Sequence, residues 1–137
     1  MDCIFCAIVA GELPAHVVAE TETALAFMDI NPATRGHCLV IPKRHAADLM
    51  EIPEDDLAEC MLLARDLARR AKDALGADGV NLLNSCGVAA WQTVFHFHIH
   101  VVPRYAGKDG LELPWVPTPG DPVVIAEAAA ALRETLD

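Results

Sequence analysis

The sequence predicts an α+β domain, in which a mainly antiparallel sheet of about five strands carries its helices on one side. Short runs of β-type residues come first and last, and they enclose one long segment of helical periodicity at 54–75. The strand–helix alternation of a doubly wound fold is missing, and so is any Gly-rich phosphate loop. With 137 residues and 53% apolar composition, we expect one domain, 1–137, with a full hydrophobic core.

The first half of the chain is expected to supply three strands. After a short apolar stretch at 3–9, the runs 17–19 and 24–28 predict a hairpin across a polar turn. The run 37–41 predicts a third strand, which Pro42 stops.

One long amphipathic helix is predicted over 54–75. Its apolar positions recur at intervals of three and four: Leu57, Met61, Ala64, Leu67, Ala68, Ala71 and Leu75. Acidic residues fill its first turn, where negative charge interacts favourably with the helix dipole. Gly76 follows its last residue, and glycine is the residue preferred just after a helix C-terminus.

The rest of the chain predicts two more strands and a C-terminal helix. The strands are 80–83 and 95–102, the second ended by Pro103. A Gly- and Pro-rich segment follows, and an Ala-rich helical pattern then covers 123–136.

Charge and cysteine content limit the possible partners. A net charge of −10 argues against binding a long nucleic acid, whereas a mononucleotide needs only a local pocket. No apolar run reaches membrane-spanning length and no signal peptide is recognisable, so we expect a cytoplasmic chain without a membrane partner. The odd number of cysteines, five, agrees with free thiols in a reducing compartment.

The most informative motif is the alternation of His96, His98 and His100. In a strand these side chains share one face, about 7 Å apart, while the apolar residues between them fill the other face. A helix would turn the middle ring away from the other two. Three neutral imidazoles on one face suit a metal or phosphate chemistry near neutral pH.

Four segments together resemble the histidine triad (HIT) superfamily of nucleotide hydrolases and transferases, in the bacterial-type branch that keeps a Cys-x-x-Cys pair. The triad stretch 92–102 carries the signature, and 3–14, 26–32 and 35–45 agree with it in order and spacing. The resemblance covers 3–104 and implies a HIT-like fold. The tail 105–137, with its expected helix, lies outside it.

The resemblance implies a nucleotide-binding hydrolase that cleaves at the α-phosphate. His98 would be the nucleophile and form a nucleotidyl-histidine intermediate, His100 and His37 would flank the phosphate, and Thr93 would assist the leaving group. The expected reaction is hydrolysis of a purine nucleoside phosphoramidate or acyl-nucleotide to the mononucleotide. Cleavage of dinucleoside polyphosphates, or a zinc-stabilised nucleotide-binding module with little turnover, are the alternatives. A transferase is disfavoured because His100 is present.

The resemblance also implies which residues bind the nucleotide. The base pocket is matched by the apolar residues Phe5, Ile8, Phe27 and Ile30, and the partner of the ribose hydroxyls by Asp29. The polar residues expected around the leaving group are Asn84, Ser85, Gln92 and Thr93. Phe27 and Ile30 could instead be ordinary core. Two departures from the family pattern, Trp91 in place of Gly and Ser85 in place of an amide, point to a changed leaving-group pocket.

The pair Cys3 and Cys6 has the spacing of a zinc chelate that needs two further ligands. The resemblance supplies His45 and His96, and such a closed Cys₂His₂ shell implies structural Zn²⁺ and no catalytic metal. A thioredoxin-like redox pair is the rival, but the strand–helix context of that motif is missing. The resemblance further implies a homodimer.

Overall fold

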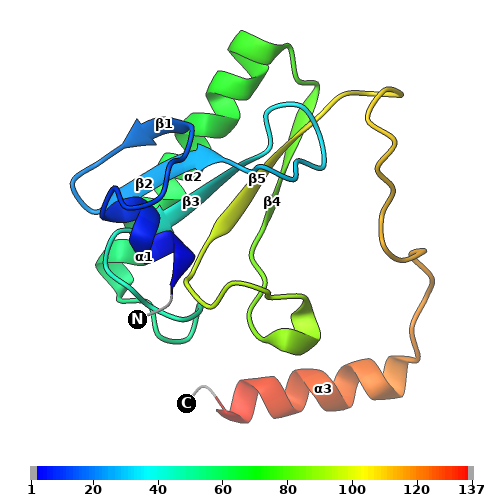
Figure 1. Ribbon diagram of the computed structural model, residues 1–137. Helices are drawn as coiled ribbons and strands as arrows, with labels where there is room; N and C mark the ends of the chain where they lie inside the picture. The colour runs from blue at the N-terminus through cyan, green and yellow to red at the C-terminus, as the bar shows by residue number, and fades with distance from the viewer. Residues whose placement is uncertain (1–2, 136–137) are drawn as a thin grey trace.

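The computed structural model describes residues 3–135 and has one five-stranded sheet. The strand order is β1-β2-β3-β5-β4, and every neighbouring pair is antiparallel. The strands are β1 (Val17–Glu20), β2 (Ala24–Met28), β3 (Cys38–Pro42), β4 (Gly79–Leu83) and β5 (Ile99–Arg104). The α-helices are α1 (Ile4–Val9), α2 (Glu54–Leu75) and α3 (Pro122–Thr135), and a 3₁₀ turn spans Val88–Ala90. The expected α+β class and antiparallel sheet are confirmed (Figure 1).

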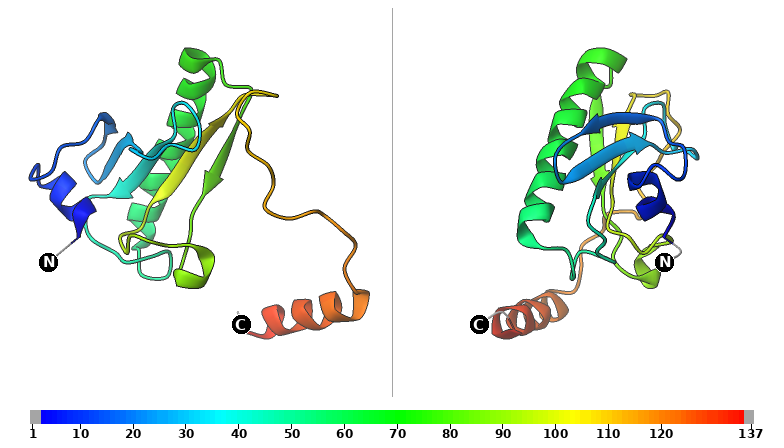
Figure 2. Two further views of the ribbon diagram at one scale, coloured as in Figure 1. Left: turned by 45° about the vertical axis from the view of Figure 1, so that its right-hand side comes forward. Right: turned by 60° about the vertical axis from the view of Figure 1, so that its left-hand side comes forward.

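The two faces of the sheet pack against different elements. On one face α2 buries Cys60, Leu63 and Ala64 against alternate strand residues such as Val40 and Ile99. On the other face Phe5 of α1 packs with a second set of buried residues, Leu25, Phe27, Leu39 and Ile41. The two helices therefore lie on opposite sides of the sheet (Figure 2), and the expectation that all helices lie on one side is wrong.

The long helix agrees with its predicted bounds, and Gly76 follows it in the left-handed conformation. The sequence did not indicate α1, a helix of six residues. The strand predicted at 95–102 begins only at Ile99, and it runs through Pro103 to Arg104. At Pro103 only β4 pairs with it, because the ladder to β3 ends at the Cys38–Val101 pair, so the missing N–H of proline is tolerated.

The C-terminal helix α3 extends away from the sheet at the end of a long segment without regular structure (Figures 1 and 2). It begins one residue before its predicted start, and the predicted last residue, Leu136, lies outside the described residues. None of the helices within 3–135 is long and apolar enough to cross a membrane.

Gly36 precedes His37 and has a φ of +89°, which other residues rarely adopt. A Cβ here would overlap Cδ1 of Leu75 and lie 3.2 Å from Cγ of Pro103. We expect Gly36→Ala to lower the free energy of unfolding by about 2–3 kcal/mol, from backbone strain plus this overlap. Gly11, which has a φ of +77° and no atom within 4 Å of the place where a Cβ would lie, is the matched control.

Urea denaturation of the two variants would measure the difference. Gly11→Ala should cost about 1 kcal/mol, from strain alone. Equal losses in the two variants would contradict a steric role for Gly36.

Candidate functional site

The predicted strand holds only the last of the three histidines: His100 lies in β5, whereas His96 and His98 precede it. The rings of His98 and His100 lie with their centroids 5.0 Å apart, on the face of the sheet that Phe5 covers. Phe97 and Ile99 between them are 1% and 2% exposed and pack into the core under α2. From Phe97 to His100 the chain therefore alternates between the core and the polar site, residue by residue.

His98 is buried, and its hydrogen bond defines its tautomer. Nδ1 lies 2.8 Å from the carbonyl oxygen of His96. A carbonyl can only accept, so Nδ1 carries the proton and Nε2 keeps its lone pair. Burial lowers the pKa of His98, despite opposing effects of the His96 hydrogen bond and Asp29, so the ring is neutral near pH 7. Nε2 can thus act as a nucleophile without first losing a proton.

The rings of His37 and His100 are hydrogen-bonded to each other, and their contacts determine which nitrogen donates and which accepts. The amide of Ala33 donates to Nδ1 of His37 at 2.9 Å, so Nε2 of His37 carries the proton. That nitrogen lies 2.9 Å from Nδ1 of His100 and donates to it. In a neutral His100 the remaining proton is therefore on Nε2, which makes it a hydrogen-bond donor in the site.

Burial also keeps this pair uncharged. It lowers the pKa of His37, with Asp29 acting in the opposite direction. For His100, burial, followed by the nearby His98 and His37, lowers the pKa to about 4.

These shifts predict acid sensitivity. Between pH 6.5 and about 4 the unfolded chain binds a proton at His100 that the folded chain does not, so stability is complete above pH 6.5 and falls as the pH drops. The loss should reach at most about 3 kcal/mol, and His37 adds to it in the same direction. Urea denaturation between pH 7.5 and 4 would measure it. His100→Asn should show a shallower acid loss than the wild type, and identical slopes would contradict the assignment.

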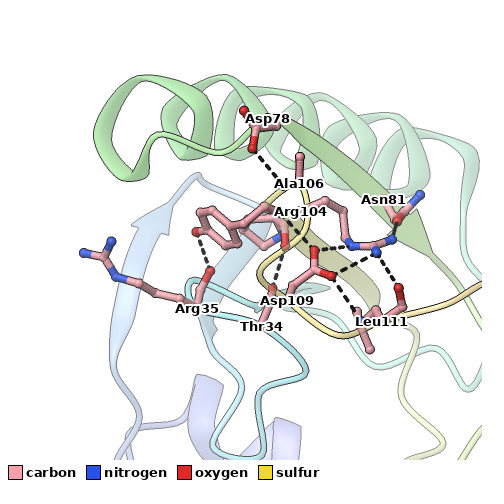
Figure 3. Close-up of polar contacts among 10 residues, drawn as sticks. Thr34, Arg35, Asp78, Asn81, Arg104, Ala106, Asp109 and Leu111 are labelled. Carbon is pink, nitrogen blue, oxygen red and sulfur yellow. Dashed lines mark hydrogen bonds and ion pairs between the residues drawn. The ribbon is translucent and has the colours of Figure 1, made fainter.

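The loop that holds His37 is anchored to the end of β5. Buried Thr34 donates its hydroxyl to the carbonyl of Pro103 at 2.6 Å, and the Tyr105 hydroxyl donates to the carbonyl of Arg35 at 2.7 Å. Figure 3 shows the Thr34 side chain and the Arg35 carbonyl directed at this segment, while the Arg35 side chain extends away from it. Sequence reasoning missed Thr34, because its partner is a backbone carbonyl 69 residues away.

Arg104, the last residue of β5, anchors the segment that follows the sheet. Its guanidinium donates to both carboxylate oxygens of Asp109, to Oδ1 of Asn81 and to the carbonyl of Leu111 (Figure 3). Asp78 accepts from the amide of Ala106 in the same turn. These bonds fix the direction of the tail where it starts.

The residues expected to bind the nucleoside differ in accessibility. Asp29 lies beside the histidines of the site, with Oδ2 at 3.5 Å from Nε2 of His37. Phe5 and Phe27 are 5% and 3% exposed, whereas Ile8 is half-buried and Ile30 is 83% exposed. Phe27 is thus a core residue in this structure, and Ile30 is not.

The residues expected near the leaving group are mainly engaged with the backbone. Gln92 is buried, and its side chain accepts from the amide of Gly87 and donates to the carbonyls of Ala47 and Val94. Asn84 donates to the carbonyl of His98 at 2.9 Å. Both side-chain amides therefore hold the loop and the segment that carries His98.

The other three positions in this loop differ in exposure. Ser85 is buried and Thr93 is exposed. Trp91, where the family pattern has glycine, has a φ of +76° and is 67% exposed. The backbone thus keeps a conformation typical of glycine, and the indole is accessible to solvent.

Four predicted metal ligands come together at one end of the site. Nδ1 of His96 lies 3.3 Å from Sγ of Cys3 and 3.5 Å from Sγ of Cys6. Nδ1 of His45 lies 3.3 Å from both Sγ of Cys6 and Nδ1 of His96. Zinc bonds of about 2.0–2.3 Å place tetrahedral ligand atoms about 3.3–3.8 Å apart, so these separations fit Zn²⁺. We name these four residues the Cys/His cluster.

A hydrogen bond outside the Cys/His cluster prepares His96 for a metal. Its Nε2 donates to the carbonyl of Pro42 at 2.8 Å, which leaves the lone pair of Nδ1 facing the other three ligands. The residues present therefore fit zinc.

A second group with ligand atoms close together, Asp29, His37 and His100, does not fit a metal as it stands. Nδ1 of His37 already accepts a hydrogen bond, so coordination through Nε2 would require removal of the only ring proton. This group is better suited to hydrogen bonding with an anion.

Comparison with known proteins agrees with this geometry. A model of the HIT domain matches residues 10–107. The chain is 39% identical to the adenosine 5'-monophosphoramidase hnt1 of Schizosaccharomyces pombe over 89% of each chain. Its structure resembles SMU.412c of Streptococcus mutans with a TM-score of 0.92 and 39% identity, over 99% of this chain and 86% of that one.

A zinc-bound histidine triad family protein from Mycobacterium smegmatis is also similar. It is 42% identical, with a TM-score of 0.78 over 100% of this chain and 99% of that one. The domain match, the sequence identity and the shared fold lead to one conclusion: the chain belongs to the HIT family.

Proposed function

We propose that this protein hydrolyses purine nucleoside phosphoramidates or acyl-nucleotides to the mononucleotide. The observation that carries the proposal is the neutral His98, whose Nδ1–H is held by the His96 carbonyl and whose Nε2 is free to attack. Similarity to relatives named adenosine 5'-monophosphoramidase, from two yeasts, supports this substrate class.

The reaction would have two steps. Nε2 of His98 attacks the α-phosphorus, the bond from phosphorus to the leaving nitrogen or acyl oxygen breaks, and that group departs with its electron pair. A proton from a donor in the site neutralises a leaving amine. Water then attacks the nucleotidyl-histidine and gives up one proton, which restores the donor used in the first step or passes to solvent. The phosphorus–Nε2 bond breaks, and the mononucleotide leaves with His98 restored as the neutral ring.

The neighbouring histidines would bind the phosphate. Nε2–H of His100 is a donor to a non-bridging phosphate oxygen, and the hydrogen bond from His37 holds this ring in place. Such preorganised donors stabilise the charge that develops on phosphorus in the transition state. Asp29, beside this pair, would accept hydrogen bonds from the ribose hydroxyls.

The base and the leaving group would contact the more exposed of the expected residues. Ile8 and Ile30 would offer apolar surface to a purine, and Ile8 packs against the buried rings of Phe5 and Phe27. Thr93 would donate its hydroxyl to the leaving group, while Asn84 and Gln92 keep the surrounding loop in place and Ser85 lies buried beside them in the chain.

The Cys/His cluster would hold a structural zinc ion, which would stabilise the fold around the site and take no part in the chemistry. Elemental analysis of protein purified without added metal should give about one zinc per chain.

Steady-state assays with adenosine phosphoramidate and with a diadenosine polyphosphate would test the substrate class. We expect a higher kcat/KM for the phosphoramidate. A higher value for the diadenosine compound would support the polyphosphate hydrolase alternative, and tight mononucleotide binding without turnover of either would support a binding module.

We also propose a homodimer. Leu82 and Leu83 are 41% and 45% exposed on β4, an edge strand, and Met61 and Leu62 are 46% and 52% exposed on α2. Pairing of two such surfaces would bury this apolar area. Sedimentation at micromolar concentration tests it, and a monomer would contradict it.

A further inference from the structure

Phe5 lies between the Cys/His cluster and the nucleophile. It occupies α1 between Cys3 and Cys6, and within α1 it is the residue whose side chain is buried. Its ring centroid is 5.2 Å from that of His98, with an interplanar angle of 89°, and 5.9 Å from that of His96, at 70°. One ring therefore contacts both a ligand of the cluster and the residue that would attack phosphorus.

Phe5 offers little surface to a nucleotide. Only 5% of the residue is exposed, and Phe27 covers another side at a centroid distance of 5.4 Å. A base stacks on accessible apolar area, which Ile8 and Ile30 provide instead. An effect of Phe5 on the reaction should therefore act through His98.

Ile8 and Val9 pack α1 against the sheet, and the two cysteines tie its N-terminal end to the histidines of the cluster. A helix of six residues is not stable by itself, since nucleation is unfavourable and few hydrogen bonds follow it. Sγ of Cys3 lies 3.3 Å from Nδ1 of His96, and Sγ of Cys6 lies 3.3 Å from Nδ1 of His45. Coordination of one metal ion by these atoms would fix α1, and with it the ring of Phe5.

We propose that Phe5 is a positioning residue, which couples the state of the Cys/His cluster to the orientation of the His98 ring. The His96 carbonyl holds one edge of that ring through Nδ1, and Phe5 packs against it edge to face, so the ring cannot turn while both contacts persist. When the cluster loses its metal, α1 loosens, Phe5 withdraws and Nε2 of His98 is no longer held in line with phosphorus. This inference rests on the proposed function, in which His98 is the nucleophile.

Kinetics of Phe5→Leu provide the first test. With adenosine phosphoramidate, we expect kcat to fall by about 10–100-fold, because a displaced nucleophile reacts slowly, while KM stays within about 3-fold. Phe97→Leu is the matched control: it removes the same kind of ring from a residue next to His98 in the chain, but on the face under α2, where Phe97 is 1% exposed. It should lower the melting temperature and leave kcat within about 3-fold.

A base-contact role for Phe5 would give a different result. In that case KM would rise and kcat would hold, with a change in preference between adenosine and guanosine substrates. That outcome would overturn the proposal, as would equal losses of kcat in Phe5→Leu and Phe97→Leu.

The coupling itself can be observed without turnover. NMR of ring-labelled histidine would follow the His98 signals in zinc-loaded and metal-stripped protein. In the wild type, we expect stripping to shift and broaden them. In Phe5→Leu the signals should already resemble those of the stripped wild type, and stripping should change them little. Equal changes on stripping in the two proteins would overturn the proposal.

Two further measurements keep the outcomes distinct. If Phe5→Leu does not fold, Phe5→Met retains the packing volume without the ring, and the same shifts are expected. If the wild type hydrolyses neither phosphoramidate nor polyphosphate, the proposed function fails, whereas the NMR comparison still decides whether Phe5 links the cluster to His98.

Discussion

Substitution of His98 by alanine is expected to lower kcat on adenosine phosphoramidate by about 10³-fold or more, which corresponds to about 4 kcal/mol of lost transition-state stabilisation. The ring proposed to attack phosphorus is missing in this variant, and no other imidazole takes its place, since Nδ1 of His100 already accepts from His37. Mononucleotide affinity, measured by titration calorimetry, should change by less than about 10-fold, because Asp29 and His100 would still hold the ligand.

His16 is the control for this experiment. Its side chain is exposed, and it lies outside both histidine groups. His16→Ala should keep full activity. Turnover by His98→Ala at the wild-type rate would refute the nucleotidyl-histidine mechanism, even if the substrate class were correct.

Loss of one cluster ligand should have the largest effect on stability. In Cys6→Ser we expect zinc to fall well below one per chain and the free energy of unfolding to drop by about 3 kcal/mol or more, since metal bound only by the folded state stabilises it. For a chain of this length that corresponds to a fall in Tm of about 10 °C. Elemental analysis and thermal denaturation measure the two quantities.

Cys86→Ser is the matched control. Cys86 is a half-buried free thiol outside the Cys/His cluster, so its substitution should keep the zinc and most of the stability. Equal stability of Cys6→Ser and Cys86→Ser, each with a full complement of zinc, would contradict the ligand assignment.

Helical periodicity, together with apolar runs bounded by turn residues, was enough to predict the main elements of the fold. The 22 residues of α2 repeat their apolar pattern over about six turns, and β2 and β3 are short apolar runs bounded by turn residues. The helix α1 was missed because six residues are too few to show a period, and because its N-terminal cap is the unusual thiol of Cys3. Pro103 was wrongly predicted to end the last strand. A proline is tolerated inside a strand when the neighbour that would accept its N–H does not extend that far, and the sequence does not show this.

The chemistry of the site could be predicted where residue type and spacing carry it. The alternation of the triad and the Cys-x-x-Cys spacing indicated the residues that the fold brings together. The tautomers were not predictable, because they depend on backbone groups such as the Ala33 amide and the Pro42 carbonyl, which every sequence contains. For the same reason, the structural use of Gln92 and the exposure of Ile30 became clear only from the packing.

The Cys/His cluster also bears on how long the folded state lasts. Cys3 and His96 are 93 residues apart in the chain, and Cys6 and His45 are 39 apart. Closing such long loops is slow relative to local structure, so these four residues should meet only after the sheet and α2 have assembled. Contacts that form after the folding transition state slow unfolding without accelerating folding. A metal at this position would therefore act mainly on the lifetime of the native protein, by holding its first helix to the segment just before its last strand, β5.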